Sequence, residues 1–195
     1  MGTATQGTPP VQVTVITATI LGREPLLVRA AASVAAQTVP CDWLVCVDES
    51  GRGAAWARNT AATLAETEWL AFLDDDDELL PEHLSWLLQG SGDADVVYSL
   101  PDPSGKTPPV GPYDPQRLRA GNYIPVTALV RRTMFEEVGG FPDVYAEDWA
   151  LWLALTDAGA RFRFVPVATW VYHRTEGSKQ QQRPGRARLG LTDGV

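Results

Sequence analysis

Hydrophobic residues along the chain follow two alternating periods, one typical of buried strands and one of helices packed on a sheet. Residues 11–20 are rich in Val, Ile and Thr and predict a first strand that is buried on at least one face. The pattern then predicts, in order, a helix at residues 24–37, a strand at residues 43–47, an alanine-rich helix at residues 53–66 and a short buried strand at residues 69–73. Because strands and helices alternate, we expect an α/β fold with a mostly parallel, Rossmann-like central sheet flanked by helices.

The second half of the chain continues the pattern less regularly. We expect helices at residues 81–89, 133–138 and 147–158, and strands at residues 95–100, 123–131 and 161–172, the last interrupted at Pro166. Residues 101–115 contain six prolines, too many for a regular element, and are expected to form a surface excursion. We expect one domain at residues 11–177, preceded by a disordered lead at residues 1–10 and followed by a mobile, basic tail at residues 178–195.

Polar residues gather where the first three strands end. Thr17 and Thr19 close the first strand, Asp48 follows the second, and residues 74–77 are four consecutive aspartates directly after the third. Ligands of parallel α/β sheets bind beyond the carboxyl ends of the strands, so these side chains are expected to face one crevice.

The four aspartates carry an electrostatic cost, because adjacent carboxylates repel each other unless a cation neutralises them. Divalent cations with oxygen ligands do so, and Mg²⁺ in particular binds one or two carboxylates together with substrate phosphates. The alternative is a solvated acidic turn that caps the next helix, since acidic residues favour a first turn and Pro81 suits a helix start.

Composition and charge narrow the classes of function. The chain has 195 residues, 45% of them hydrophobic, which is typical of a globular domain, and a net charge of −8, which argues against a general nucleic-acid-binding surface. An anionic substrate would need a metal or well-placed arginines. Cys41 and Cys46 lack the spacing of a zinc ribbon or a redox pair. With no signal peptide or membrane span expected, the cysteines point to a reducing, cytoplasmic location.

Several motifs, in this order, resemble those of the family 2 glycosyltransferases, which use nucleotide sugars and have the GT-A fold. The resemblance runs from about residue 11 to residue 178. It rests on the first strand at 13–19, Ser-x-x-x-Gln-Thr at 33–38, the second strand with its acidic turn at 45–50, Ala-Arg-Asn-x-Ala at 57–61, Phe-Leu-Asp-x-Asp-Asp at 72–77, Gly-Gly-Phe at 139–141 and Glu-Asp-Trp-x-Leu-Trp-Leu at 147–153. Asp-x-Asp alone is common, and Ala61 replaces the family's usual glycine. The resemblance is specific because all of these motifs occur together and in the family's order.

The resemblance implies a donor-binding set. Thr17 and Asp48 would hold the nucleoside, and Arg58 would approach the diphosphate as a planar cation. Asp74 would contact the ribose or the waters of the metal, and Asp76 would bind the metal, Mn²⁺ or Mg²⁺. Two further residues, Thr19 and Asp75, complete the set. Without the motif, Arg58 would be interpreted as an exposed helix arginine.

The resemblance also implies an acceptor side. Asp148 would be the general base, with Glu147 and the neighbouring aromatic residues helping to raise its pKa. A capping carboxylate is the commoner role of an aspartate at a helix start. His173 lies in a segment similar to the family's Tyr-Arg-x-His-x-x-Ser and would be a metal ligand or diphosphate contact, although here Arg174 follows the histidine. His83 is interpreted as a solvated or core histidine.

The implied activity is metal-dependent, inverting transfer of a sugar from a nucleoside-diphosphate sugar, with UDP favoured, to an acceptor hydroxyl. Three alternatives remain. One is a retaining transferase or a nucleotidyltransferase of similar fold, although residues 21–23 are too slight for a triphosphate-binding loop. The second is a non-catalytic sugar- or partner-binding module. In the third, the acceptor is a nucleic acid held by the basic tail, instead of a saccharide, a lipid-linked molecule or a protein. Independently of the acceptor, the tail could close over the bound donor as a lid.

Overall fold

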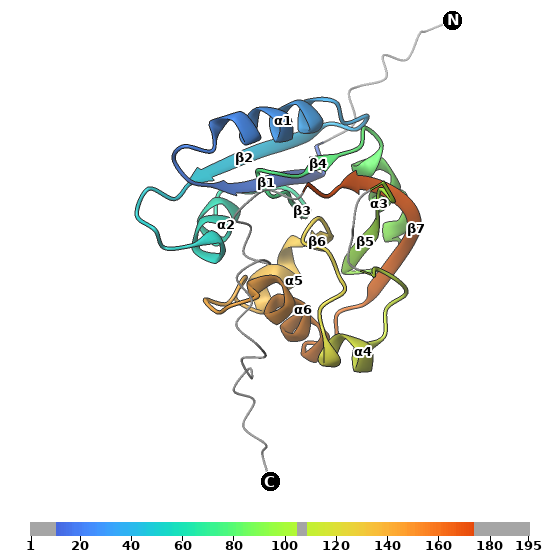
Figure 1. Cartoon of the computed structure of the whole chain (residues 1–195). Helices are drawn as coiled ribbons and strands as arrows, with labels where there is room; N and C mark the ends of the chain where they lie inside the picture. Colours follow the sequence, from blue (N-terminus) through green and yellow to red (C-terminus); the bar gives the residue numbers. More distant parts are fainter. Residues whose placement is uncertain (1–10, 105–108, 174–195) are drawn as a thin grey trace, which may run out of the picture.

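A seven-stranded mixed sheet forms the centre of the molecule (Figure 1). The computed structural model describes residues 11–104 and 109–173. The strands are β1 (Val13–Thr19), β2 (Cys41–Val47), β3 (Trp69–Phe72), β4 (Glu78–Leu79), β5 (Val96–Pro101), β6 (Leu129–Arg131) and β7 (Phe162–Val171). Their order in the sheet is β2-β1-β3-β6-β5-β7-β4. Strands β2, β3, β5 and β7 run in the direction of β1, whereas β4 and β6 run against it, so the sheet is mixed but mostly parallel.

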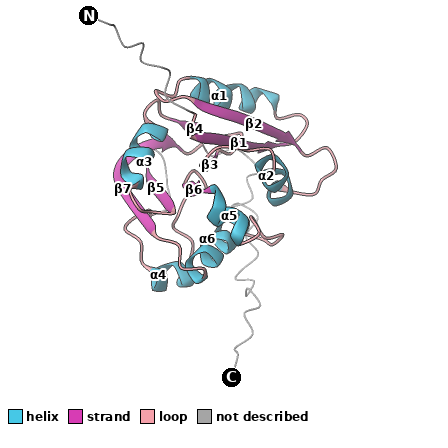
Figure 2. Cartoon of the chain, turned by 180° about the vertical axis from the view of Figure 1, so that it is seen from behind, coloured by secondary structure: helices cyan, strands magenta, loops and turns pink. Residues whose placement is uncertain are grey.

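Helices cover both faces of the sheet. They are α1 (Glu24–Ala35), α2 (Ala54–Ala62), α3 (His83–Ser91), α4 (Pro115–Ala120), α5 (Arg132–Glu137) and α6 (Glu147–Asp157). The apolar residues of α1 and α3 share one hydrophobic core, and those of α2, α5 and α6 share the other. Figure 2 shows α1 above β1 and β2, with α2, α5 and α6 on the opposite side of these strands. Successive side chains of each strand point to opposite faces of the sheet and so contribute to the two cores in turn. The central strands are apolar on both faces because both faces are covered.

The predicted alternation of the first five elements is confirmed, with small differences at their ends. Strand β2 begins at Cys41, and helix α2 ends at Ala62 rather than at residue 66. The helix stops because the N–H groups of Leu64 and Ala65 bond to carbonyls only three residues back, which tightens the last turn. The parallel pairing of β1 with β2 and β3 is also as expected.

The strand predicted at residues 123–131 is wrong over most of its length, because only Leu129–Arg131 pairs with neighbouring strands. The apolar residues before it fill a core instead of joining a ladder: Tyr123 and Ile124 are buried, and the Ile124 N–H donates to the Asn122 side chain. The pattern was hydrophobic because the segment is buried, and burial alone does not distinguish a strand from an irregular core segment.

Strand β7 is continuous through Pro166, where an interruption was expected. The pairing with β5 shifts register between Ser99 and Leu100, where the partner on β7 changes from Val165 to Ala168. A bulge of this kind accommodates a residue without an N–H, so the proline bends the pairing without ending the strand.

Two short elements were not expected. Strand β4 has two residues and pairs antiparallel with β7. Helix α4 lies just after the proline-rich excursion, with Asp114 as its N-cap accepting bonds from the Gln116 and Arg117 N–H groups, and with Pro115 in its first turn.

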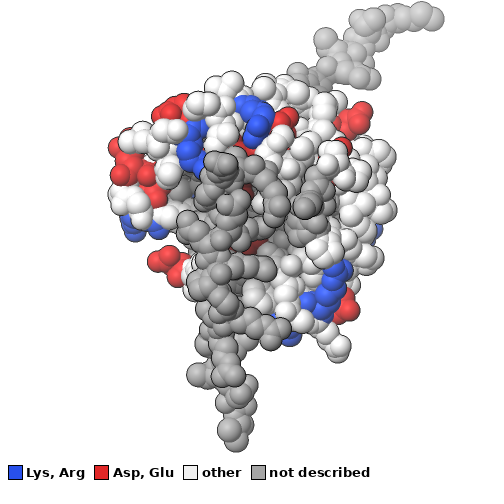
Figure 3. Space-filling view, viewed as in Figure 1, with Lys and Arg blue, Asp and Glu red and all other residues white. Residues whose placement is uncertain are grey.

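The lead predicted at residues 1–10 and the tail predicted at residues 178–195 lie outside the described residues. Within residues 11–104 and 109–173, no helix has the length and apolar character needed to cross a membrane. On the face seen in Figure 3, the Lys and Arg atoms of the described residues lie in small groups with Asp or Glu atoms nearby, without one continuous basic surface.

Candidate active site

The four aspartates form the turn between β3 and β4, at the carboxyl edge of the parallel strands. Strand β3 lies beside β1, and the Leu73 N–H donates to the Ile16 carbonyl (3.0 Å) before the chain leaves the sheet. The turn closes when the Asp77 N–H donates to the Asp74 carbonyl (3.1 Å). The carboxylates are therefore anchored to the middle of the sheet rather than to a free loop.

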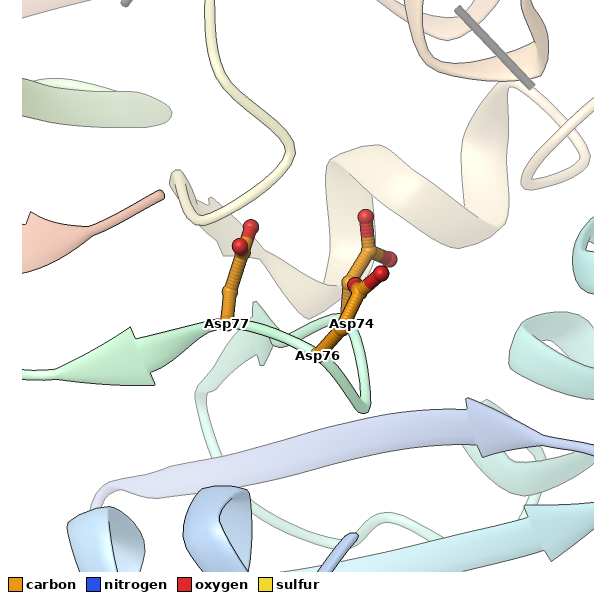
Figure 4. A group of neighbouring side chains, drawn as sticks. All are labelled: Asp74, Asp76 and Asp77. Atoms are coloured by element: carbon orange, nitrogen blue, oxygen red, sulfur yellow. The ribbon is translucent and has the colours of Figure 1, made fainter. Parts of the chain in front are cut away.

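Three of the carboxylates converge. Oxygens of Asp74, Asp76 and Asp77 lie within 4.8 Å of one another, and Figure 4 shows the three side chains on the same side of the turn. Burial raises the pKa of Asp77 to about 8, and the neighbouring Asp74 carboxylate adds to the effect. Asp77 is only 3% exposed, whereas Asp74 and Asp76 are partly exposed to solvent. Hard oxygen donors at this spacing fit a divalent cation such as Mg²⁺ or Mn²⁺.

Asp75 has a different set of partners. It accepts hydrogen bonds from the Thr19 hydroxyl (2.5 Å) and from Nε and Nη2 of Arg23 (2.8 and 2.6 Å). Arg23 also lies 3.1 Å from an Asp76 oxygen, and Arg29 donates to the Asp76 carbonyl (2.5 Å). Asp75 therefore ties the end of β1 and the segment after it to the acidic turn, and Arg23 partly neutralises that turn.

Arg58 joins the acidic turn to the start of α6. From helix α2 its Nη2 lies 2.5 Å from an Asp74 oxygen and its Nη1 lies 3.0 Å from a Glu147 oxygen. Burial by itself would lower the pKa of the Arg58 guanidinium, but the Asp74 and Glu147 carboxylates hold it above its usual value. The guanidinium also lies over the Phe141 ring, 5.1 Å from its centroid. The residue is thus a buried bridge rather than an exposed helix arginine.

Asp148 follows Glu147 in the first turn of α6. Its Oδ1 accepts from the Trp149 N–H (2.8 Å) and its Oδ2 accepts from the Asn122 amide (2.7 Å). Burial raises the pKa of Asp148, and the nearby Glu147 and Asp74 carboxylates act in the same direction, whereas the Trp149 N–H and Arg58 oppose the rise. The bond to Trp149 has the character of a helix-start contact, but the raised pKa is what a general base requires.

Asp48 lies at the end of β2, next to Thr19. The Asp48 N–H donates to the Thr19 carbonyl (2.8 Å), and its carboxylate accepts from the Gly53 N–H (2.6 Å) and from the Ser50 N–H and hydroxyl (both 3.2 Å). The bond from Gly53 is the main reason that the pKa of Asp48 is lowered. The carboxylate thus shapes the loop that leads into α2.

Thr17 does not join the other strand-end residues. Its side chain is fully buried on the face that α1 covers, where the hydroxyl accepts from the Trp43 indole N–H (3.1 Å). Thr19, two residues further on, reaches the acidic turn. Both threonines belong to β1, and it is Thr19, the last residue of the strand, that donates to Asp75.

His173 lies beside the aspartates without being part of the converging group. Its backbone N–H donates to Asp77 (2.9 Å), and its ring Nε2 lies 2.7 Å from a Glu78 oxygen. Glu78 is in turn paired with Arg29. Among the described residues, the group whose geometry suits a metal contains the three aspartates and not His173.

Three site residues were missed by the reasoning from sequence. Arg23 was not selected because a single arginine after a strand carries no signal of its own. Asp77 was seen as part of the acidic run, but its partner, the backbone N–H of His173, lies 96 residues away in the sequence. Asn122 follows the unexpected helix α4, and nothing in the linear sequence connects it to Asp148.

A GT-A type of fold, with carboxylates at the carboxyl edge of its parallel strands and a second acidic pair at the start of α6, defines the class of the protein. The family model described as "Glycosyl transferase family 2" matches residues 29–139, more than half of the chain. The chain therefore belongs to the family 2 glycosyltransferases.

The chain is similar to the pre-mycofactocin glycosyltransferase of Mycobacterium tuberculosis, with 28% identity over 162 residues, which cover 70% of this chain and 33% of that protein. Among solved structures it resembles S. aureus TarS in complex with UDP-GlcNAc, with a TM-score of 0.72, 18% identity, and coverage of 89% of this chain and 62% of that chain. It also resembles a mannosyltransferase of Pyrobaculum calidifontis in complex with GDP-Man and Mn²⁺, with a TM-score of 0.64, 18% identity and coverage of 88% and 59%. The chain thus spans about a third of the length of the curated relative it matches.

Proposed function

We propose that this chain transfers a sugar, with inversion at the anomeric carbon, from a nucleoside-diphosphate sugar to an acceptor hydroxyl, and that it requires a divalent metal. The observation that carries the proposal is the link through Arg58, which binds Asp74 of the acidic turn and Glu147 beside the candidate base. The buried Arg58 guanidinium thus holds a carboxylate of the proposed donor side close to one of the proposed acceptor side. Transfer of a sugar requires this closeness, because donor and acceptor both react at the anomeric carbon.

Asp76, with Asp74 and Asp77, is proposed to hold the metal, Mn²⁺ or Mg²⁺. The three offer hard oxygen atoms within 4.8 Å, which fits such a cation. When bound, the metal would neutralise the negative charge that develops on the diphosphate leaving group. His173, whose ring pairs with Glu78, is proposed to act at the edge of this site.

Four residues are proposed to shape the donor site. Thr19 and Asp48 lie at the adjacent ends of β1 and β2, where a nucleoside would be held, and Asp75 fixes that edge through Thr19 and Arg23. Arg58 is proposed to contribute its positive charge toward the diphosphate. Thr17 is buried, so we assign it to the support of Trp43 rather than to direct contact.

On the acceptor side, Asp148 is the proposed general base. The acceptor oxygen forms a bond to the anomeric carbon while its proton moves to an Asp148 oxygen. The bond between that carbon and the diphosphate oxygen breaks at the same time, and the electron pair leaves with the nucleoside diphosphate. Attack from the face opposite the leaving group inverts the anomeric centre, so a covalent sugar–enzyme intermediate is not needed.

The ligands of the similar solved structures support the proposal that the donor is a nucleotide sugar. TarS is described with UDP-GlcNAc and the Pyrobaculum enzyme with GDP-Man and Mn²⁺, so UDP sugars come first in a donor search and GDP-mannose is included. We further propose that residues 11–177 form the transferase domain. Cys41 and Cys46 are both free thiols, in keeping with a cytoplasmic setting.

The test is a panel of nucleotide sugars incubated with Mn²⁺, with Mg²⁺ and with a chelator, comparing the wild type with Asp76→Ala. We expect slow, metal-dependent release of one nucleoside diphosphate by the wild type, with water as the acceptor, and at least about a hundredfold loss in the variant. A thermal shift with metal alone supplies a readout without turnover. Metal at a hundred times its dissociation constant should stabilise the wild type by about 2.7 kcal/mol and Asp76→Ala by much less.

Glu82→Ala is the matched control, because Glu82 is an exposed acidic residue near the turn that takes no part in the converging group. It should behave as the wild type. If no donor is bound or turned over with metal present, the non-catalytic module becomes the better account. Release of inorganic pyrophosphate from a nucleoside triphosphate would instead indicate a nucleotidyltransferase.

A further inference from the structure

Asn122 lies just beyond the C-terminus of α4, and both ends of its side-chain amide are bonded. The oxygen Oδ1 accepts from the Ile124 N–H (3.2 Å), and the nitrogen Nδ2 donates to Asp148 Oδ2 (2.7 Å). A backbone N–H can only donate, and an ionised carboxylate can only accept, so the two partners fix the orientation of the amide. An exposed residue with this double restraint is pre-organised toward one target, the carboxylate of Asp148.

The two oxygens of Asp148 have different tasks in this arrangement. Oδ1 is bonded to the Trp149 N–H and follows the backbone of α6, whereas Oδ2 is bonded to a side chain from another element. A carboxylate oxygen accepts two hydrogen bonds, so Oδ2 keeps one lone pair when the Asn122 bond is made. The Asn122 bond sets the rotation of the carboxylate and thereby the direction of that remaining lone pair.

We propose that Asn122 is a positioning residue for Asp148, which orients the Oδ2 lone pair toward the acceptor hydroxyl and stabilises the ionised form of the base. This inference rests on the proposed function, since it assigns a role to Asn122 through Asp148. It adds a residue from outside the motifs by which the chain resembles its family.

The charges around Asp148 make a neutral donor useful. Glu147 on its own helix and Asp74 on the acidic turn are like charges, and burial also disfavours the charged carboxylate. Arg58 is the cation that faces it, but both arginine Nη atoms are paired with other carboxylates. A hydrogen bond from an amide favours the ionised form without adding a charge that the diphosphate site would feel.

Helix α4 holds Asn122 at the right place. Leu118 is fully buried against α6, and its carbonyl accepts from the Trp149 indole N–H (2.7 Å). At the end of α4 the Gly121 N–H donates to the Arg117 carbonyl (3.1 Å). Asn122 is therefore two residues beyond a helix that is itself bonded to Trp149, the residue after the base, which places the amide beside Asp148.

Two variants separate positioning from a purely structural turn. Asn122→Asp keeps an oxygen for the Ile124 N–H but has no donor for Asp148, and it places a like charge beside it. Asn122→Ala loses both bonds. If the residue only formed the turn, Asn122→Asp would resemble the wild type and Asn122→Ala alone would be impaired.

The experiment measures the pH profile of metal-dependent donor hydrolysis, with water as acceptor, for the wild type and both variants. We expect the acidic limb of kcat/KM to move to higher pH in both, by about one pH unit in Asn122→Ala and further in Asn122→Asp. One unit corresponds to about a tenfold loss at a fixed pH below the limb. Donor KM should change little, because Asn122 does not contact the donor-side residues.

A carbon-13 NMR titration of the aspartate carboxyl groups, with Asp148→Asn to assign the resonance, gives a readout that does not depend on turnover. The pKa of Asp148 should rise in both variants. An unshifted acidic limb together with an unchanged Asp148 titration would overturn the inference. A shifted titration with an unshifted limb would overturn it too, since Asp148 would then not act as the base. If the wild type turns over no donor, the proposed function fails, and the titration separately reports whether the Asn122–Asp148 contact exists.

Discussion

At the scale of single residues, Arg58 is the side chain whose surroundings are hardest to change. Its guanidinium is buried, with 6% of the side chain exposed, and it bridges Asp74 and Glu147 at 2.5 and 3.0 Å. A planar guanidinium can bond to two carboxylates at once, whereas an ammonium group acts as a single point of charge. Removing the cation would leave two carboxylates without their shared partner in a partly dry environment.

We therefore expect Arg58→Gln to lower the free energy of unfolding by about 3 kcal/mol. Arg58→Lys should cost less, because it keeps the charge but not the fork. Urea unfolding at neutral pH, followed by tryptophan fluorescence, measures both. Millimolar Mg²⁺ should restore part of the loss in Arg58→Gln, since a metal at the acidic turn would neutralise Asp74.

The control for this measurement is Arg119→Gln. Arg119 pairs with Asp157 on the surface, where the two side chains are 54% and 60% exposed, and such pairs contribute little to stability. An equal effect of the two substitutions would mean that the Arg58 bridge contributes no more than a surface pair.

The reasoning from sequence selected candidate site residues more readily than it identified their partners. Asp74, Asp76 and Asp148 were selected because they stand in motifs that resemble those of the family. Asn122 does not stand out, since its contact with Asp148 depends on how α4 packs against α6. Thr17 was expected at the edge of the sheet with the other polar residues near the strand ends, whereas its hydroxyl accepts from Trp43 inside the molecule.

At the scale of elements, long periodic segments were predictable and short ones were not. Helix α1 has an apolar stripe on one side, and α6 is apolar at every position from Trp149 to Leu155, so both are long enough to be identified from the sequence. Strand β4 has only two residues, and it is a strand because it pairs with β7, a segment far away in the sequence. Helix α4 has six residues, and its start depends on the Asp114 cap rather than on periodicity.

Helix α6 begins with a strained residue, which gives a prediction at this scale. Ala146 has φ 63° and ψ 53°, a left-handed conformation that costs a residue with a side chain roughly 1–2 kcal/mol. Ala146→Gly relieves that cost but gains flexibility in the unfolded chain, so we expect a net stabilisation of about 0.5–1 kcal/mol. Chemical unfolding of the variant measures it.

Gly159→Ala tests the reverse change, because it introduces a side chain at a left-handed position that glycine now occupies. Gly159 ends the segment after α6 with φ 81°, and an added Cβ would meet nothing within 4 Å, so its effect reports conformation alone. We expect a loss of about 1 kcal/mol. If Ala146→Gly also lost stability, the left-handed conformation at the start of α6 would not be strained.

At the scale of the whole molecule, the fold followed from the order of the elements, whereas the antiparallel β6 did not. The first five elements alternate, and that alone requires parallel strands with helical crossovers. The position of β6 depends on which edge of β3 is left unpaired by β1. This edge is known only once the sheet has been assembled. The two hydrophobic cores, one on each face, follow from apolar residues at successive positions in β1 and β3.

A buried histidine links the stability of the whole molecule to pH. His83 is fully buried, its Nε2 donates to the Thr127 carbonyl (3.1 Å), and its Nδ1 lies 2.7 Å from the Thr169 hydroxyl. A carbonyl can only accept, so Nε2 carries a proton, and the Thr169 hydroxyl can donate to Nδ1 when the ring is neutral. Burial is the main reason that the pKa of His83 falls from 6.5 to about 4.

The unfolded state therefore binds more protons than the folded state between about pH 4 and pH 6.5, and stability is lost as the pH falls through this window. The loss from His83 amounts to at most about 3 kcal/mol. His83→Gln should lower stability at pH 7 but remove this part of the pH dependence, whereas His173→Gln, at the other histidine of the chain, should retain it. Urea unfolding at pH 7, 6, 5 and 4 provides the curves, and carboxylates common to both proteins cancel in the difference between wild type and His83→Gln. Parallel curves would contradict the prediction, because they would mean that His83 accepts a proton as readily inside the core as in the unfolded chain.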